Sequence, residues 1–194
     1  MTRLCVFCGS NPGVNPVFRE AARALAAELV ARRVGLVYGG GATGLMGALA
    51  DAVLAGGGEV VGVIPRGLMT AELAHAGLSH QHVVASMHER KALMARLADG
   101  FVALPGGLGT LEETLEVLTW AQLGIHRKPV GLVNVAGYWD DLLRLLGHAV
   151  REGFVRPEYA GLLLAEPSPA RLLDQFAVWS PPALARAWLG PAQI

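Results

Sequence analysis

The chain has 194 residues with 16 basic and 16 acidic side chains, so its formal net charge is zero, and 53% of its residues are apolar. This length suits one domain with a substantial core, and a balanced charge without blocks of one sign argues against binding to a long nucleic acid. Since no apolar run reaches the roughly 18 residues that span a bilayer and no charged leader precedes a signal-like run, we expect a soluble, cytoplasmic protein that binds no membrane.

Strands and helices are predicted to alternate along the chain. The predicted strands are short apolar runs at 3–8, 35–38, 59–65, 82–85, 100–104, 129–135 and 162–165. The predicted helices lie at 16–33, from the glycine loop at 39–47 to 55, and at 86–98, 111–123, 138–152 and 169–178. This alternation without hairpin signals predicts a Rossmann-like α/β fold, a doubly wound parallel sheet with helices on both faces. We expect a single domain over 1–179, followed by a tail at 180–194.

Cys5 and Cys8, the two cysteines of the chain, fall in the first predicted strand. Their C-x-x-C spacing resembles a redox or metal motif, but three residues of extended strand separate them by about 10 Å and place them on opposite faces. A disulfide needs Cα atoms within roughly 7 Å of each other. We therefore interpret both cysteines as packing residues.

A glycine-rich loop follows the second predicted strand. It contains G-x-G-x-x-G between a strand and a helix, the context of a dinucleotide-binding loop, although such loops usually follow the first strand. Glu59, about twenty residues further on, is a candidate for binding a ribose hydroxyl. A tight strand-to-helix turn is the alternative interpretation. Because the carboxyl ends of parallel strands meet at one edge, we expect the loops after strands one, two and five to gather there.

The most informative segment is the turn after the fifth predicted strand, where a Pro-Gly-Gly sequence leads into a helix with two carboxylates. Gly106, Gly107 and Gly109 leave backbone N–H groups bare near the positive end of the helix dipole, a combination that binds phosphate or another anion. Thr110 is the expected N-cap, and Thr110-x-x-Glu113 also matches a capping box. Since a carboxylate beside an anion loop repels the ligand unless it takes part in chemistry, Glu113 is a candidate catalytic residue.

A charged side chain falls on the apolar side of the third predicted helix. Ser86 and Glu89 match a capping box that starts this helix. At about 100° per residue, Arg90 lies in the middle of an arc of apolar side chains, where an unpaired charge costs on the order of several kcal/mol. We therefore expect Arg90 to bind Glu113, Glu112 or a ligand phosphate. The alternative is an arginine that reaches solvent past neighbouring methionines.

The fourth predicted helix, stopped by Gly124, has two apolar faces. Leu111, Leu115 and Leu118 form the face that we expect to meet the core. The second apolar face is predicted to form a homodimer interface and consists of Val117, Trp120, Ala121 and Gly124.

Four motifs occur in order along the chain and carry a family resemblance. They are Cys8-Gly9-Ser10, Gly39-Gly40-Gly41-x-x-Gly44-Leu45-Met46-Gly47, Met87-His88-Glu89-Arg90-Lys91 and Pro105-Gly106-Gly107-x-Gly109-Thr110-x-x-Glu113. Over residues 4–152 the chain resembles the LOG ("Lonely Guy") family of cytokinin riboside 5′-monophosphate phosphoribohydrolases, also labelled "possible lysine decarboxylase". The resemblance implies a Rossmann-like homodimer without metal or cofactor. It also implies hydrolysis of the N-glycosidic bond of adenosine-type nucleoside 5′-monophosphates to free base and ribose 5-phosphate.

The resemblance also implies roles for individual residues. Arg90 and Glu113 match the catalytic pair of the family. The expected substrate-binding residues combine matched family contacts with the glycine loops and are Ser10, Gly40, Gly41, Gly44, Glu72, Lys91, Gly106, Gly107, Gly109, Thr110, Glu112 and Thr119. Two departures from the family pattern are peripheral to the chemistry: Ser86 replaces the usual Asp, and Asn11 replaces a common second Ser.

The chemistry agrees with these residues. Cleavage of an N-glycoside passes through an oxocarbenium-like transition state, and a carboxylate such as Glu113 can stabilise that cation or orient the attacking water. The glycine loops would bind the 5′-phosphate, and Arg90 would orient Glu113 or contact phosphate or ribose. AMP and its N6-modified relatives are both candidate substrates.

Two rival functions draw on the same residues. A lysine decarboxylase needs pyridoxal phosphate on a Schiff-base lysine, for which the chain offers only Lys91 and Lys128, and neither position favours that role. A nucleotide-binding or sensing module without turnover would use the same glycine loops. Such a module has little use for Arg90 and Glu113, so this pair favours an enzyme.

Overall fold

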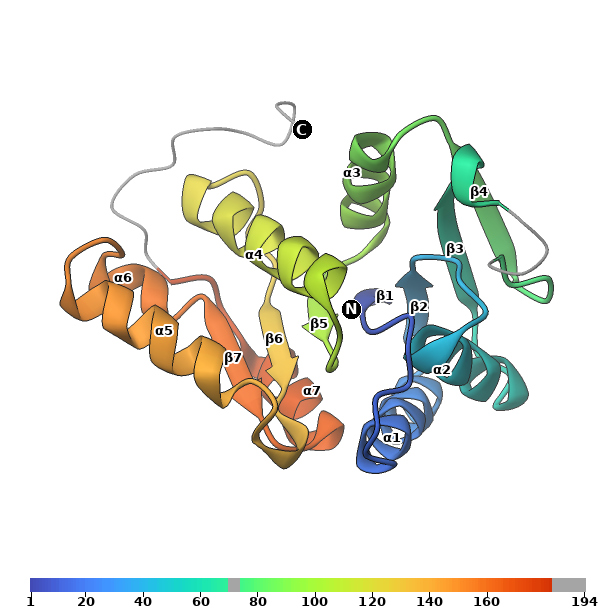
Figure 1. The fold of residues 1–194 in the computed structure, drawn as a ribbon, viewed down its shortest axis with the longest axis horizontal. Coiled ribbons are helices and arrows are strands. Elements are labelled where there is room, and N and C mark those ends of the chain that lie inside the picture. Colours follow the sequence, from blue (N-terminus) through green and yellow to red (C-terminus); the bar gives the residue numbers. More distant parts are fainter. Residues whose placement is uncertain (70–73, 183–194) are drawn as a thin grey trace.

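The computed structural model describes residues 1–69 and 74–182, which form one sheet of seven strands with helices on both faces (Figure 1). Glu72, expected at the substrate, and residues 183–194 of the predicted tail lie outside the described residues. Within the two described ranges, no helix combines the length and apolarity needed to cross a bilayer.

Strands and helices alternate as predicted. The strands are β1 (Arg3–Phe7), β2 (Gly35–Tyr38), β3 (Val60–Pro65), β4 (His80–Val84), β5 (Phe101–Ala103), β6 (Val130–Val133) and β7 (Leu163–Glu166). The α-helices are α1 (Val17–Ala31), α2 (Gly44–Ala55), α3 (Met87–Leu97), α4 (Leu108–Leu123), α5 (Asp140–Arg151), α6 (Pro157–Ala160) and α7 (Pro169–Val178). The short α6 is not predicted from the sequence, and neither are the 3-10 turns η1 (Arg66–Leu68) and η2 (Val135–Gly137).

All neighbouring strands are parallel, in the order β4-β3-β2-β1-β5-β6-β7. The chain winds outward from β1 to β4 and then returns to the other side of β1 with β5, whose Phe101 is in register with Cys5. The winding direction therefore reverses between β1 and β5. Doubly wound sheets bind ligands at such a reversal, outside the carboxyl ends of the strands. The topology confirms the predicted Rossmann-like fold.

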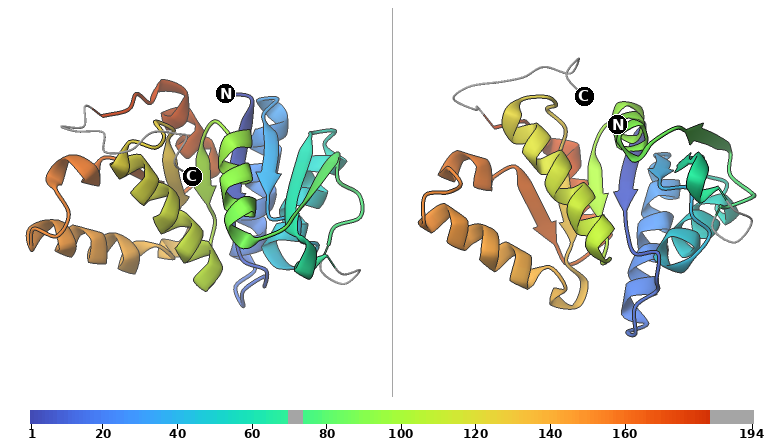
Figure 2. Two further views of the ribbon diagram at one scale, coloured as in Figure 1. Left: turned by 90° about the horizontal axis from the view of Figure 1, so that it is seen from above. Right: turned by 45° about the horizontal axis from the view of Figure 1, so that its top comes forward.

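Two layers of helices enclose the sheet (Figure 2). Helices α1, α2 and α7 pack on one face, and α3, α4 and α5 pack on the other. Because both faces are covered, every residue of β2, β3, β5 and β6 is buried, as expected for central parallel strands. Leu25 and Leu29 of α1 are fully buried in the same core as Leu36 of β2.

Cys5 and Cys8 are free thiols buried on opposite faces of the sheet. Cys5 packs in the core beneath α3 and α4, and Cys8 packs in the core beneath α1 and α2. Burial raises the pKa of both thiols above the ordinary value. Their interpretation as packing residues is confirmed.

The start of α4 differs from the prediction. The helix begins at Leu108 with Gly107 as its N-cap, so Thr110 lies within the first turn and is not the N-cap. Thr110 is instead buried against Gly106, where a Cβ would lie 2.1 Å from Thr110 Oγ1. The predicted end is confirmed, because Gly124 has a φ of 85°, in the left-handed region that terminates helices.

The apolar faces of α4 follow the prediction only in part, because Leu111 packs against the core residues Ala103, Leu132 and Trp139 but the rest of the predicted core face does not. Val117 and Ala121 are buried in the core, whereas Leu115 is 38% exposed. Leu115 and Leu118 line an apolar cleft between α4, α5, α6 and β7. Val117 packs in the same core as Phe101, Ala121 packs with Tyr159 and Leu162, and of the three predicted core leucines only Leu115 is exposed.

Candidate active site

Arg90 and Glu113 form a shielded ion pair at the carboxyl edge of the sheet. Arg90, in the first turn of α3, donates from Nη1 to Glu113 Oε1 at 2.7 Å and from Nε to the carbonyl of Val63 at 3.1 Å. The two charged side chains are only 12% and 11% exposed. Among the anionic partners that the sequence allows, Arg90 therefore contacts Glu113, and the solvent-reaching alternative is wrong.

The predicted capping box positions Arg90. Ser86 Oγ accepts the N–H of Glu89 at 3.1 Å, and the Glu89 carboxylate accepts the N–H of Ala85 at 2.8 Å, so α3 has a fixed start. The Arg90 guanidinium lies over Gly39, where a Cβ would come within 2.1 Å of Nη2. A side chain at residue 39 would thus displace the arginine, which explains this glycine without any ligand contact.

Glu113 has the features of a reactive carboxylate. Burial raises its pKa above the ordinary value, and the charge of Arg90 acts in the opposite direction. Its side chain bonds to Arg90 instead of returning to the backbone of Thr110, so the capping-box interpretation of Glu113 is wrong. A buried, paired carboxylate at a ligand-binding edge is a candidate for chemistry.

The loops after β1, β2 and β5 meet at this same edge, as predicted. The N–H of Gly9 donates to Pro105 O, and the N–H of Leu45 donates to Gly9 O, both at 3.0 Å. Gly44 has a φ of +62°, and a Cβ there would lie 2.3 Å from the backbone of Ser10. The glycines therefore allow three loop backbones to pack directly on one another.

A cavity of about 300 Å³ opens between these loops and is lined by Ser10, Gly106, Gly107, Phe18 and Tyr138, among others. The N–H of Leu111 donates to Gly107 O at 3.0 Å, which closes the first turn of α4, so the N–H groups before it point out of the helix end. Apart from adjacent residues and the helix's own backbone, no heavy atom of the described residues lies within 4 Å of a Cβ built on Gly107 or Gly109. This open, positively polarised turn has the geometry of a phosphate site.

Gly40 and Gly41 are buried and contact Ala74 and His75, which precede β4. The N–H of His75 donates to Gly40 O at 3.0 Å, and Gly41 forms an antiparallel bridge with Ala74. The ring of His75 in turn bonds through Nε2 to Asp51 of α2 at 2.9 Å. These glycines therefore hold Ala74 and His75 against the loop before α2.

The two lysines have structural partners. Lys91 Nζ contacts Glu112 at 2.6 Å and Glu116 at 2.9 Å, and although burial opposes its charge, these two hydrogen bonds raise its pKa. Lys128 Nζ donates to the carbonyls of Ala95 and Ala98 at the end of α3. Neither amine faces the glycine turns, so the site does not fit a pyridoxal phosphate bound as a Schiff base.

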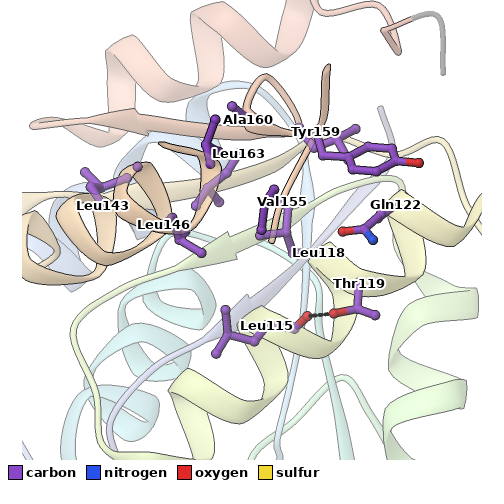
Figure 3. A pocket seen from close by; sticks show the side chains of 13 residues that line it. Leu115, Leu118, Thr119, Gln122, Leu143, Leu146, Val155, Tyr159, Ala160 and Leu163 are labelled. Carbon is purple, nitrogen blue, oxygen red and sulfur yellow. Dashed lines mark hydrogen bonds between the residues drawn. The ribbon is translucent and has the colours of Figure 1, made fainter. Parts of the chain in front are cut away.

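Two residues that were expected to contact a ligand, Thr119 and Glu59, lie away from this site. Thr119 is on the outward side of α4, where its hydroxyl donates to Leu115 O at 2.7 Å and lines the cleft of about 310 Å³ between α4, α5, α6 and β7 (Figure 3). Glu59 lies at the amino end of β3, the far edge of the sheet, and accepts hydrogen bonds from Arg3 at 2.9 and 2.8 Å. A ribose-binding role for Glu59 is therefore wrong.

Tyr138 is a residue of this site that no sequence motif indicates. Its hydroxyl donates to Gly106 O, and its ring lines the same cavity as Ser10. One feature of the sequence could have indicated it: Tyr138 follows soon after the sixth predicted strand. Side chains just after the carboxyl ends of parallel strands lie close together at one edge of the sheet. The pattern instead assigns Tyr138 to the following helix, which begins at Asp140.

A doubly wound sheet with a buried arginine–carboxylate pair beside a phosphate-type turn defines a Rossmann-like enzyme. Residues 46–176 match the family model described as "Possible lysine decarboxylase". Cytokinin riboside 5′-monophosphate phosphoribohydrolase LOG7 of Arabidopsis thaliana is 54% identical over 92% of this chain and 82% of that protein. LOG1 of the same plant is 50% identical over 92% of this chain and 84% of that protein. The chain belongs to the LOG family, as its four motifs predict.

Solved structures confirm the architecture. The molybdenum cofactor carrier protein of Chlamydomonas reinhardtii matches 92% of this chain and 99% of its own with a TM-score of 0.69 at 19% identity. The molybdenum cofactor binding protein of Rippkaea orientalis matches 91% of this chain and 96% of its own, also with a TM-score of 0.69, at 20% identity. At these identities the likeness concerns the fold alone.

Proposed function

We propose that this protein hydrolyses the N-glycosidic bond of adenosine-type nucleoside 5′-monophosphates, releasing the free base and ribose 5-phosphate. The observation that carries the proposal is the buried Arg90–Glu113 pair beside the open glycine turn. Relatives that are 50–54% identical over most of the chain are named cytokinin riboside 5′-monophosphate phosphoribohydrolases, which supports the same reaction here.

The proposed reaction gives Glu113 a defined task. The bond between ribose C1′ and the base nitrogen breaks, the base leaves with the bonding electrons and gains a proton, and water adds to C1′ with loss of a proton. Positive charge develops on the ribose, and the ionised carboxylate of Glu113 stabilises it. Arg90 holds this carboxylate through Oε1, and its charge favours the ionised form that burial opposes.

The phosphate and the ribose meet different parts of α4. Glu113 lies five residues beyond the first residue of the helix, about 8 Å along its axis. The N–H groups around Gly107 and Gly109 are placed to receive the 5′-phosphate, and the hydroxyl of Ser10 lines the same cavity. One nucleotide can therefore be bound by its phosphate while its glycosidic bond lies near the carboxylate.

Product analysis tests this proposal. AMP, isopentenyladenosine monophosphate and the two corresponding nucleosides are each incubated with the protein, and free base and ribose 5-phosphate are separated by chromatography. We expect both products from the monophosphates and no base from the nucleosides, because only the monophosphates can use the glycine turn. Equal rates on nucleosides would contradict the phosphate role, and binding of AMP without release of adenine would support a non-catalytic module.

We also propose a homodimer, with the leucine face of α4 in place of the face first predicted. Leu115, Leu118 and the neighbouring apolar side chains of α5 line a cleft that is open in the single chain (Figure 3). Thr119 lies in this cleft, away from Glu113. A second copy packed against α4 is the arrangement in which Thr119 can approach a substrate, as the family resemblance implies for this residue.

Light scattering tests the dimer. We expect a mass of two chains for the unmodified protein at micromolar concentration and a mass of one chain for Leu118→Glu, because a charge in the cleft opposes burial. Leu145→Glu is the matched control, since Leu145 is 61% exposed on α5 but outside the cleft. A monomer in the unmodified protein, or equal dissociation by both variants, would contradict this interface.

A further inference from the structure

Tyr138 lies in the turn after β6, and its side chain connects this turn to the glycine turn after β5. Its hydroxyl donates to Gly106 O at 2.5 Å, and the two residues are 32 positions apart in the chain. The ring lines the cavity between the loops together with Ser10 and Gly107, and the residue is 40% exposed. A tyrosine so exposed does not need this hydrogen bond for its own burial, so the bond acts mainly on the glycine turn.

The backbone that carries Tyr138 is held firmly. Asn134 Oδ1 accepts the N–H of Trp139 at 2.8 Å, and Asn134 Nδ2 donates to Asp140 Oδ1 at 2.7 Å. Between them Ala136 has a φ of 52°, a left-handed conformation that is uncommon for alanine and persists only where surrounding contacts enforce it. The turn therefore presents Tyr138 from a fixed backbone.

The ring of Tyr138 is oriented by two other aromatic rings. Phe18, from α1, meets it edge to face with centroids 5.7 Å apart and planes at 77°. Trp139, which is buried, meets it with centroids 5.0 Å apart and planes at 90°. Edge-to-face contacts are favourable and directional. The hydroxyl is therefore aimed at Gly106 before any ligand arrives.

The bond to Gly106 O has a consequence for the next N–H. In a trans peptide the C=O of one residue and the N–H of the next point in opposite directions in one plane. Holding the Gly106 carbonyl towards Tyr138 therefore directs the Gly107 N–H the other way. With glycine on both sides, this peptide unit has little steric resistance to rotation, so an external hydrogen bond is needed to fix it.

We infer that Tyr138 is a positioning residue that fixes the Gly106–Gly107 peptide, so that the Gly107 N–H is preset to donate to the substrate's phosphate. This inference rests on the proposed function, which places a phosphate at the turn. A preset donor binds more tightly because no rotational freedom is lost at the moment of binding. The effect belongs to phosphate affinity, and the chemical step at Glu113 is separate from it.

Tyr138→Phe tests this role by removing only the hydroxyl. Binding of ribose 5-phosphate and of inorganic phosphate is measured by calorimetry, and kcat and KM are measured with AMP. We expect Kd for both anions and KM to rise about tenfold, the size of one hydrogen bond, while kcat changes by less than about twofold. Tyr38→Phe is the matched control and should change none of these values, because the Tyr38 hydroxyl is buried in the core and has no hydrogen-bond partner among the described residues.

Amide hydrogen exchange supplies a second readout in the free protein. We expect faster exchange at residues 106–111 in Tyr138→Phe than in the unmodified protein, with the rest of the sheet unchanged. Equal anion affinity and equal exchange in the two proteins would overturn the inference, and so would a fall in kcat with unchanged Kd. If the unmodified protein itself binds neither anion, the proposed phosphate site is wrong as well, which separates the two failures.

Discussion

Glu113→Gln is expected to lower turnover of a nucleoside monophosphate by roughly a hundredfold or more while leaving ribose 5-phosphate affinity nearly unchanged. Glutamine has the same shape but carries no charge, so it cannot stabilise the developing cation on the ribose. Glu113 does not cap α4, and the glycine turn does not depend on it. Turnover is measured by release of free base, and affinity is measured by calorimetry.

The control for this substitution must change the net charge equally. Glu152→Gln does so at an exposed residue at the end of α5, far from the glycine loops. We expect Glu152→Gln to retain normal turnover. Unchanged turnover in Glu113→Gln would end the catalytic interpretation of this residue, and loss of ribose 5-phosphate binding together with turnover would show that the residue serves binding instead.

Arg90→Ala is expected to lower both stability and turnover, because it leaves the Glu113 carboxylate buried without its counter-charge. Removing one partner of a buried pair costs about 3 kcal/mol or more in unfolding free energy. Denaturant titration measures this loss and steady-state assays measure turnover. Arg90→Lys keeps the charge but not the forked contact that also reaches Val63 O, so we expect it to be the less damaged variant.

The pH dependence of Arg90→Ala follows from the sign of the shift at Glu113. Burial already raises the pKa of this carboxyl, and Arg90 lowers it, so loss of Arg90 raises the pKa further. The acid limb of the kcat profile should therefore move to higher pH in the variant. The stability loss should be largest above this pKa and shrink as the pH falls through it, because the protonated carboxyl no longer needs a counter-charge.

The double variant Arg90→Ala with Glu113→Gln shows whether the two residues act as a unit. If they do, its loss of turnover is smaller than the product of the two single losses, since the second substitution damages a site that is already inactive. Multiplicative losses would mean that Arg90 and Glu113 do not act together in turnover.

The fold was predictable because each element carries its own local signal. Helix α7 and strand β2 have the predicted bounds, and Ser86 caps α3 as its motif indicates. The orientation of α4 was not predictable from spacing. Leu115 and Leu118 have the same helical period as Val117 and Ala121, and only packing against the sheet decides which set turns inward.

The sequence predicted which residues belong to the site better than it predicted which of them contact one another. An arginine on an apolar stripe demands an anion, but the choice of Glu113 depends on how α3 and α4 lie across the sheet, which no local pattern records. Thr110-x-x-Glu113 matches a capping box because that motif is defined only by residue types and their spacing. The true N-cap, Gly107, has no side chain from which the sequence could identify it as a cap. Tyr138 and Gly106 are 32 positions apart in the chain, and no motif around either residue predicts their hydrogen bond.

The central place of β1 also governs when the protein becomes active during its synthesis. One edge of β1 pairs with β2, in which Gly35 lies opposite Arg3, but the other edge waits for β5, in which Phe101 lies 96 residues after its partner Cys5. Contacts of such sequence separation form slowly, and until then β1 offers an unpaired strand edge to other chains. A nascent chain that ends before β5 can contain β1 to β4 and even Arg90, yet it has neither Glu113 nor the phosphate turn. Activity therefore appears only when this edge of the sheet is closed.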